Sequence, residues 1–216
     1  MISSVSELKN KKRPIVLIGG GGHAAVLADI LLCQKRHIIA LISLDDCSQR
    51  SVLKQLPQLF SDEDIHKFPP KDVVLVMGIG IIPRSQVRKR LISHFEALGY
   101  VFETVVASNA YVSPHAKIKH GAQVLTNAVV HTGSIVHSHT IVNSGAVVEH
   151  DCEVGVGCHI APNATLCGQV ICGNDVFVGA GSVILNNLRL KSKSIVGAGV
   201  TLSRHIKEKE IIRRSE

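Results

Sequence analysis

The segment from Asn143 to Cys152 crowds charged residues into a stretch that is otherwise built of apolar and small ones. It contains the tripeptide Glu149, His150 and Asp151. Histidine titrates near neutrality, so it suits the removal of a proton from an attacking amine or hydroxyl. A neighbouring carboxylate can hold the tautomer of the ring and raise its basicity. We therefore expect His150 to act as a general base with Asp151 as its partner, and Glu149 is a second candidate for the partner.

A second chemical signal is the glycine run Gly19 to Gly22, which follows the apolar run Ile15 to Ile18 and precedes a helical pattern from about His23. Glycines let the backbone approach a phosphate, and a helix start offers free N–H groups and a positive dipole end. We expect a strand, a phosphate-binding loop and a helix here, as at the opening of a nucleotide-binding βαβ unit.

Two more apolar runs end in residues that suit a nucleotide site. The run Ile38 to Leu44 ends in Asp45 and Asp46, whose carboxylates can accept hydrogen bonds from a ribose or sugar hydroxyl. The run Asp72 to Met77 ends at Gly78-Ile-Gly80. Because ligands bind at the carboxyl ends of parallel strands, we expect these loops and the glycine run to gather there.

The remainder of this N-terminal region predicts two further elements. A helix is expected over Arg84 to Leu98, and a last strand over Tyr100 to Val106 that leads into the following part of the chain.

From Val112 to Thr201 the sequence repeats every six residues without a slip. The first position of each hexad is aliphatic from Val112 to Val196, with Cys172 as the single exception, and the fifth position is almost always small. A period of six does not fit a 3.6-residue helix, and an ordinary β-sandwich predicts irregular spacing. A fixed short period with β-branched residues indicates a stacked solenoid with a shared core.

The hexads Val154-Gly-Val-Gly-Cys-His and Val178-Gly-Ala-Gly-Ser-Val resemble those of the hexapeptide-repeat acyltransferases. The resemblance implies a left-handed parallel β-helix in which three hexads make one coil, so that 15 hexads make five coils and residues 18 apart stack. With the preceding region the fold class is an α/β Rossmann-like N-terminal domain (residues 1–107) plus a C-terminal left-handed parallel β-helix with a tail (residues 108–216).

A short nucleotide-fold domain that opens with Gly-Gly-His and precedes hexads resembles the sugar O- and N-acetyltransferases of the sialic-acid and bacillosamine pathways, over essentially the whole chain. The resemblance implies that acetyl-CoA is the cosubstrate, that His150 and Asp151 of an E-H-[DE] pattern are catalytic, and that the chain is a homotrimer with shared sites. Acetyl-CoA contacts are expected at His159, Gly168, Ala180 and Ala198, with the stacked Gly168 N–H as an oxyanion donor. Nucleotide-sugar contacts are expected at Gly21, Gly22, His23, Asp45, Asp46 and Gly80.

The chain departs from this family in two places. Ile81 and Ile82 follow the third-strand glycines where relatives have Asn, and the tail Leu202 to Glu216 lacks a Gly-x-Pro-Ala stretch. The expected function is N-acetylation of a UDP- or GDP-linked 4-amino-deoxy sugar for surface glycans. The alternatives are O-acetylation of sialic acid or a related nonulosonate, a non-catalytic sugar-nucleotide sensor, and a zinc protein resembling γ-carbonic anhydrase, suggested by His131, His137, His139, His150 and His159.

Composition narrows the partners. The net charge is +7, but no basic run is interleaved with aromatics, so an anionic small molecule is favoured over nucleic acid. Six cysteines without metal or redox spacing are typical of a reducing compartment. Residues 1–12 lack the apolar core of a signal peptide, and Ile15 to Leu32 is interrupted by glycines, His23 and Asp29. We expect a protein of the bacterial cytoplasm with no membrane span and no metal cofactor.

Overall fold

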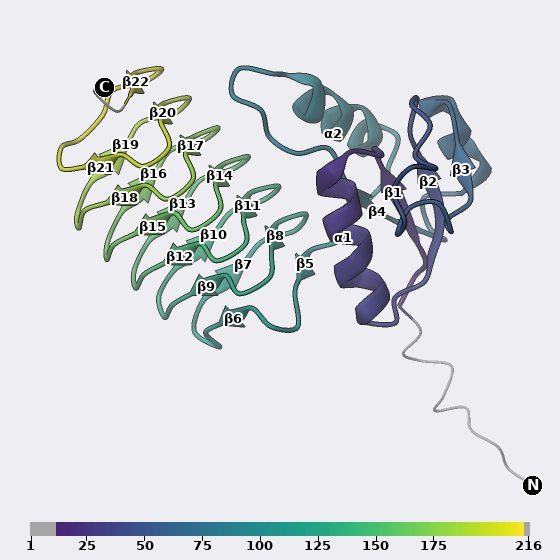
Figure 1. Ribbon diagram of the computed structural model, residues 1–216, viewed down its shortest axis with the longest axis horizontal. Helices are drawn as coiled ribbons and strands as arrows, with labels where there is room; N and C mark the ends of the chain where they lie inside the picture. Colours follow the sequence, from purple (N-terminus) through teal and green to yellow (C-terminus); the bar gives the residue numbers. More distant parts are fainter. Residues whose placement is uncertain (1–11, 214–216) are drawn as a thin grey trace, which may run out of the picture.

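The computed structural model describes residues 12–213 of the 216-residue chain as an α/β domain docked against the side of a β-helix (Figure 1). We expected no export signal in residues 1–12, and residues 1–11 of this segment lie outside the described residues. Within the described part no helix is long and apolar enough to cross a membrane, and the apolar stretch Ile15 to Leu32 is a strand, a loop and most of a helix.

The N-terminal domain is built on a four-stranded parallel sheet of order β3-β2-β1-β4. Its elements are β1 (Ile15–Ile18), α1 (Gly22–Cys33), β2 (Ile38–Ile42), β3 (Gln58–Leu59), the 3-10 helix η2 (Asp62–Lys67), β4 (Val74–Met77) and α2 (Val87–Ala97). The chain order reverses between β1 and β4, and such a switch point is where open α/β sheets bind ligands. The Rossmann-like prediction is confirmed.

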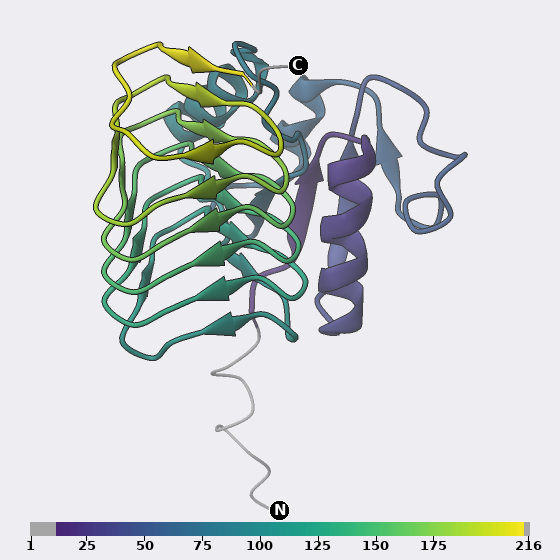
Figure 2. The same ribbon diagram turned by 60° about the vertical axis from the view of Figure 1, so that its left-hand side comes forward.

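The all-apolar strand β1 explains why both faces of this sheet are covered. Ile15 and Leu17 pack with α1 on one face, whereas Val16 and Ile18 pack with α2 and η2 on the other. Because strand side chains alternate, a run without polar residues is buried on both sides. Figure 1 shows α1 on the side of the sheet that faces the β-helix, and Figure 2 shows the N-terminal domain beside the stacked coils.

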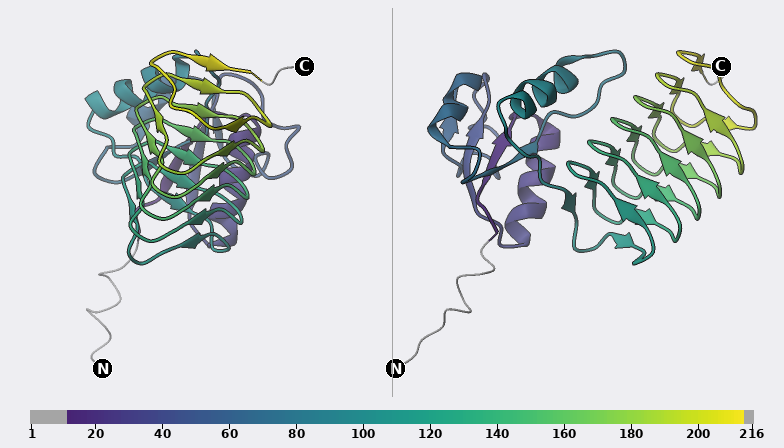
Figure 3. Two further views of the ribbon diagram at one scale, coloured as in Figure 1. Left: turned by 90° about the vertical axis from the view of Figure 1, so that its left-hand side faces the viewer. Right: turned by 180° about the vertical axis from the view of Figure 1, so that it is seen from behind.

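The C-terminal part is a left-handed parallel β-helix with three flat faces of two-residue strands (Figure 3). Face I contains β7 (Lys117–Ile118), β10 (Ile135–Val136), β13 (Glu153–Val154), β16 (Ile171–Cys172) and β19 (Arg189–Leu190). Face II contains β5 (Val105–Val106), β8 (Gln123–Val124), β11 (Ile141–Val142), β14 (His159–Ile160), β17 (Phe177–Val178), β20 (Ile195–Val196) and β22 (Ile211–Ile212). Face III contains β6 (Tyr111–Val112), β9 (Val129–Val130), β12 (Val147–Val148), β15 (Thr165–Leu166), β18 (Val183–Ile184) and β21 (Thr201–Leu202).

The hexad determines what lies inside and how each corner turns. Residues 18 apart pair in register, as Val124 with Val142 and Val142 with Ile160, and the first-position side chains form one buried core. Every sixth residue from Gly121 to Gly199 has positive φ, the left-handed conformation that Gly, Asn and Asp adopt most easily. The small fifth-position side chains fit the interior next to these corners, and burial raises the pKa of the inward Cys158 thiol to about 12.

The β-helix extends beyond the expected five coils at both ends. Val105 and Val106 pair with β8 of face II, so the strand expected over Tyr100 to Val106 divides, and in the N-terminal domain only Phe102 adds a single bridge beside Leu75 of β4. At the other end β22 pairs with β20, which places residues expected in the tail within a further partial coil. Val106 keeps the hexad spacing, since it stands 18 residues before its partner Val124, whereas Ile212 stands 16 residues after its partner Val196 and so breaks it.

Candidate functional site

The predicted base and its partner lie together at the corner between faces III and I. The Nδ1 atom of His150 is 2.9 Å from Oδ2 of Asp151, and both side chains are about half exposed, at 51% and 55%. Because a carboxylate only accepts, this contact places the ring proton on Nδ1 and leaves the lone pair on Nε2. Asp151 has φ of 59°, the left-handed position of the hexad, which turns its side chain back onto the neighbouring ring. Glu149 instead lies 3.8 Å from Nε2 of His131.

Gly168 stacks one coil above His150, as the 18-residue spacing predicts. The backbone N–H of Gln169 donates to the His150 carbonyl at 3.0 Å. A Cβ atom at position 168 would lie 2.5 Å from the His150 Nε2 atom. Only glycine at position 168 leaves room for the imidazole of His150. Gly168 therefore determines where the ring lies, independently of any hydrogen bond that its own N–H donates.

His159 lies on face II, turned toward the N-terminal domain of the same chain. Its Nε2 accepts from the Asn143 amide at 3.0 Å, and its Nδ1–H donates to the Ile81 carbonyl at 3.3 Å. The ring is 9% exposed and meets Phe177 edge to face. Burial lowers the pKa of His159 to about 4, so the ring is neutral at physiological pH with both nitrogens occupied. The acetyl-CoA contact expected of His159 could therefore be made only by the carbon atoms of its ring.

The other two positions expected to contact acetyl-CoA occupy the third corner. Ala180 and Ala198 are exposed and stacked at the corner between faces II and III, where the Gly199 N–H donates to the Ala180 carbonyl at 2.8 Å. Within one chain, the residues expected to contact acetyl-CoA therefore lie on one face and at two different corners of the β-helix.

The glycine loop and the loop after β4 meet at the switch point of the sheet, as predicted. The Gly78 N–H donates to the Ile18 carbonyl, and the Gly19 N–H donates to the Ile42 carbonyl, both at 2.7 Å. Each of the three loops is therefore tied to its neighbour at the carboxyl ends of β1, β2 and β4.

The glycines of this loop differ in what they do. Gly19 has φ of 95°, whereas a Cβ at Gly20 would lie 1.9 Å from the Cys47 sulfur. Gly21 has φ of −76°, which other residues adopt without strain, so its backbone conformation does not require glycine. Gly21 and Gly22 are exposed, and a Cβ at Gly21 would meet no atom within 4 Å. Open space above a helix N-terminus is what a bound diphosphate requires.

Asp45 and Asp46 are exposed in the loop after β2. Asp46 is occupied by its own turn, since it accepts from the backbone N–H and the hydroxyl of Ser48 at 2.9 and 2.8 Å, and these hydrogen bonds lower its pKa. The carboxylate of Asp45 has no such partner among residues 12–213, which makes it the better placed of the two to accept from a sugar hydroxyl.

His23, at the start of α1, joins the two domains. Its Nε2–H donates to the Gln123 side chain at 2.7 Å, and the Gln123 amide donates to the Met77 carbonyl at 2.9 Å. A Cβ atom at Gly80 would lie 3.5 Å from the His23 Cβ atom and 3.7 Å from Cγ of its ring. Burial lowers the pKa of His23 to about 4, so this ring is also neutral.

The pattern of motifs did not point to Arg88, Gln123 or Asn143. Arg88 of α2 is 6% exposed and donates to the carbonyls of Met77, Ile79 and His139. Burial lowers its pKa to about 9. The sequence does indicate which face of the β-helix packs against the N-terminal domain. The outward residues of face II, such as Gln123, Ile141 and His159, are uncharged. Face I has charged residues in the same strand position, namely Lys117, Glu153 and Arg189.

A cavity of about 650 Å³ opens between the loop after β4 and face II. Gly80, Ile82, Phe177 and Ile195 line its apolar part. The cations Arg84, Lys89, Lys193 and Lys209 outnumber the acids Glu96 and Asp175 around it, and Lys89 pairs with Asp175 at 2.9 Å. Among the predicted site residues, Gly80 lines this cavity. An anionic molecule with an apolar or planar part fits such a lining.

Comparison with known proteins agrees with this arrangement. Residues 14–95 match the PglD N-terminal domain family. The whole fold is similar to PerB from Caulobacter crescentus, crystallised with CoA and GDP-perosamine, with 27% identity, a TM-score of 0.82 and 92% of each chain covered. It is also similar to the acetyltransferase domain of PglB from Neisseria gonorrhoeae in complex with acetyl coenzyme A, with 28% identity, a TM-score of 0.79, and 90% and 93% covered.

The chain therefore contains a PglD N-terminal domain and shares its fold, over nine tenths of its length, with acetyltransferases crystallised with CoA or acetyl coenzyme A. WeeI from Acinetobacter baumannii, at 21% identity and a TM-score of 0.74 over 92% and 93% of the two chains, shares the fold. The backbone carbonyl of Ile81, the residue after Gly80, accepts from His159, so this contact does not depend on the side chain at position 81.

Proposed function

We propose that this protein transfers the acetyl group of acetyl-CoA to the amino group of a nucleotide-linked 4-amino-deoxy sugar used in surface-glycan biosynthesis. The observation that carries the proposal is the His150–Asp151 pair one coil below Gly168, in a chain whose other domain is a PglD N-terminal domain. The crystallisation of PerB with CoA and GDP-perosamine supports this class of donor and acceptor.

His150 acts as the base through Nε2. The neutral amine of the sugar attacks the thioester carbonyl, and His150 takes the proton that the nitrogen loses as the C–N bond forms. Asp151 holds the Nδ1 proton and stabilises the imidazolium that results. When the C–S bond breaks, the coenzyme A thiolate leaves and receives the proton from His150, so no covalent enzyme intermediate forms. The Gly168 N–H is assigned to the oxyanion.

The acetyl-CoA site is formed between two copies of the chain in a homotrimer. His150 and Gly168 of one copy face the groove from the corner of faces III and I, and His159, Ala180 and Ala198 of the next copy line its other wall. The separation of these residues within one chain supports a shared site, because one chain cannot bring them to one acetyl group. In a trimer with threefold rotational symmetry, this contact between neighbouring copies occurs three times.

The acceptor binds with its nucleotide in the N-terminal domain, residues 1–107, and its sugar directed to the β-helix, residues 108–216. The diphosphate is assigned to the open space over Gly21 and Gly22, with His23 and Gly80 behind it. Asp45 and Asp46 are assigned to hydroxyls of the ribose or sugar. The cations around the 650 Å³ cavity attract an anionic acceptor.

Release of free thiol from acetyl-CoA tests the proposal, measured with UDP-, GDP- and dTDP-linked amino sugars and with free sialic acid. We expect one UDP- or GDP-linked 4-amino sugar to exceed all others in kcat/KM. His150→Ala should lower kcat by on the order of 10²- to 10⁴-fold, and Asp151→Asn should lower it less. Acetylation of free sialic acid alone, or a His150→Ala variant with more than a third of wild-type kcat, would overturn the proposal.

A zinc hydratase of the γ-carbonic-anhydrase type is disfavoured, since such an enzyme has no use for the domain matched at residues 14–95. A sensor without catalysis would leave acetyl-CoA intact in every arm of the same assay.

A further inference from the structure

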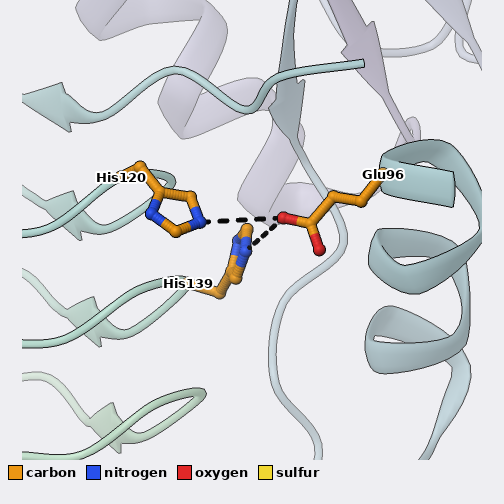
Figure 4. Close-up of side chains that lie close together, drawn as sticks. All are labelled: Glu96, His120 and His139. Atoms are coloured by element: carbon orange, nitrogen blue, oxygen red, sulfur yellow. Dashed lines mark hydrogen bonds and ion pairs between the residues drawn. The ribbon is translucent and has the colours of Figure 1, made fainter. Parts of the chain in front are cut away.

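Three metal-ligating side chains converge where α2 meets the β-helix, at the corner between faces I and II (Figure 4). The Oε1 atom of Glu96, from α2, lies 2.9 Å from Nε2 of His139 and 3.7 Å from Nε2 of His120. The three donor atoms all lie within 4.8 Å of one another. This corner differs from the one that carries His150, so the cluster is separate from the proposed catalytic pair.

The two imidazoles are held in place by their surroundings. The Nδ1 atom of His120 is 3.0 Å from the hydroxyl of Ser138, one coil above it. His139 is 9% exposed on its side chain and meets the rings of Phe102 and His120 edge to face. An outer hydrogen bond such as the one from His120 to Ser138 fixes the ring of a metal ligand and directs its other nitrogen to the ion.

His139 also occupies a backbone position that most side chains avoid. Its φ is 59°, the corner position that Gly, Asn or Asp fills in most other coils. Its carbonyl accepts from the buried Arg88, which fixes the turn against α2. A histidine at a corner where this chain otherwise uses mostly Gly, Asn or Asp, and aimed at a carboxylate from the other domain, points to a use for the imidazole.

Zinc sites have ligand–metal distances near 2.0–2.2 Å, which in a tetrahedron separates the ligand atoms by roughly 3.4 Å. The two separations from Glu96 lie on either side of that value, at 2.9 and 3.7 Å. Two imidazoles and one carboxylate are a set that Zn²⁺ accepts, with water as a fourth ligand.

We propose that Glu96, His120 and His139 bind one Zn²⁺ ion, or a similar divalent transition metal, that links α2 of the N-terminal domain to two coils of the β-helix. This site was not expected from the sequence, in which no metal was predicted and His120 was not considered. It takes no part in acetyl transfer. By linking the domains it fixes the glycine loop relative to the β-helix.

Zinc binding by the full chain is the test, after chelator treatment and its removal. Titration with ZnSO₄ should show one site per chain, and zinc at 100 times its Kd should raise Tm by roughly 5–10 °C. Glu96→Gln keeps the shape and a hydrogen-bond acceptor for His139 but removes the charge, and His120→Ala removes an exposed ligand without opening the core. Each should weaken zinc binding at least tenfold while leaving the metal-free Tm within about 2 °C.

His137→Ala is the matched control. His137 pairs with Glu153 at 3.0 Å on face I, as His139 pairs with Glu96, but no third ligand joins that pair in the described chain. This variant should bind zinc like the wild type. Absence of a stoichiometric site in the wild type would overturn the proposal, as would Glu96→Gln and His120→Ala variants that bind zinc with wild-type affinity. None of these measurements uses an acetyl-transfer assay, so the zinc proposal can fail or succeed independently of the proposed function.

Discussion

Replacement of Gly168 by Ala tests how closely the position of His150 is set. The added Cβ would lie 2.5 Å from Nε2, whereas ordinary contacts begin at about 3.4 Å, so the ring must retreat by about 0.9 Å. A misplacement of this size in a catalytic group costs on the order of 10²-fold in rate. The backbone tolerates the change, since Gly168 is not among the positive-φ positions. Because the His150 side chain is 51% exposed and can move outward, stability should change by only about 0.5 kcal/mol.

The assay is thiol release at saturating acetyl-CoA and acceptor, with Tm measured beside it. A double-mutant cycle with His150→Ala separates the two roles of position 168, because alanine retains the N–H that would polarise the carbonyl. If the methyl acts by displacing the ring, the double variant is no slower than His150→Ala alone. A Gly168→Ala enzyme with more than a third of wild-type kcat would refute the reasoning, and so would a double variant slower by a further hundredfold.

Other predictions concern the loop, the buried histidine and the shared site. Gly21→Val should fold normally and raise the nucleotide-sugar KM at least tenfold, about 1.4 kcal/mol, whereas Gly20→Ala should lower Tm because its Cβ meets the Cys47 sulfur; equal Tm values for both would contradict this packing. Because the pKa of His159 falls to about 4, the unfolded chain binds a proton that the folded chain does not between about pH 6.5 and 4, so stability is full above pH 6.5 and declines below it. At pH 5 the loss is about 2 kcal/mol, and urea midpoints of His159→Gln should show a correspondingly weaker pH dependence. Mixing His150→Ala with His159→Ala subunits should restore activity, and no recovery after verified subunit exchange would exclude the shared site.

The sequence predicted the parts of the fold that depend on local periodicity. The hexad predicted a solenoid, and the resemblance to hexapeptide-repeat acyltransferases, which implies three hexads in one coil, predicted the stacking of Val124, Val142 and Ile160 and of Gly168 above His150. The glycine loop and the loop after β4 were also located correctly, since strand ends in a parallel sheet must meet at one edge.

What the sequence did not predict depends on contacts between distant segments. Arg88 and Gln123 look like ordinary surface residues of a helix and a hexad, and only the docking of the two domains buries them. The same docking turns His159 inward against Ile81. Val105 and Val106 were assigned to the wrong sheet because a two-residue apolar strand fits either partner.

The docking through His23 and Gln123 has a consequence for how acceptor size can change in this family. Gln123 lies on face II one coil below Ile141, and His150 stands nine residues after Ile141, in the same coil. The number of coils between Gln123 and His150 therefore determines how far the base lies from the nucleotide loop. Insertion of 18 residues between them would raise His150 by one strand spacing, about 4.8 Å, without turning its side chain. Insertion of six would carry it to another corner. As long as the strands keep the hexad spacing, the distance between the nucleotide loop and the base therefore changes in steps of one coil.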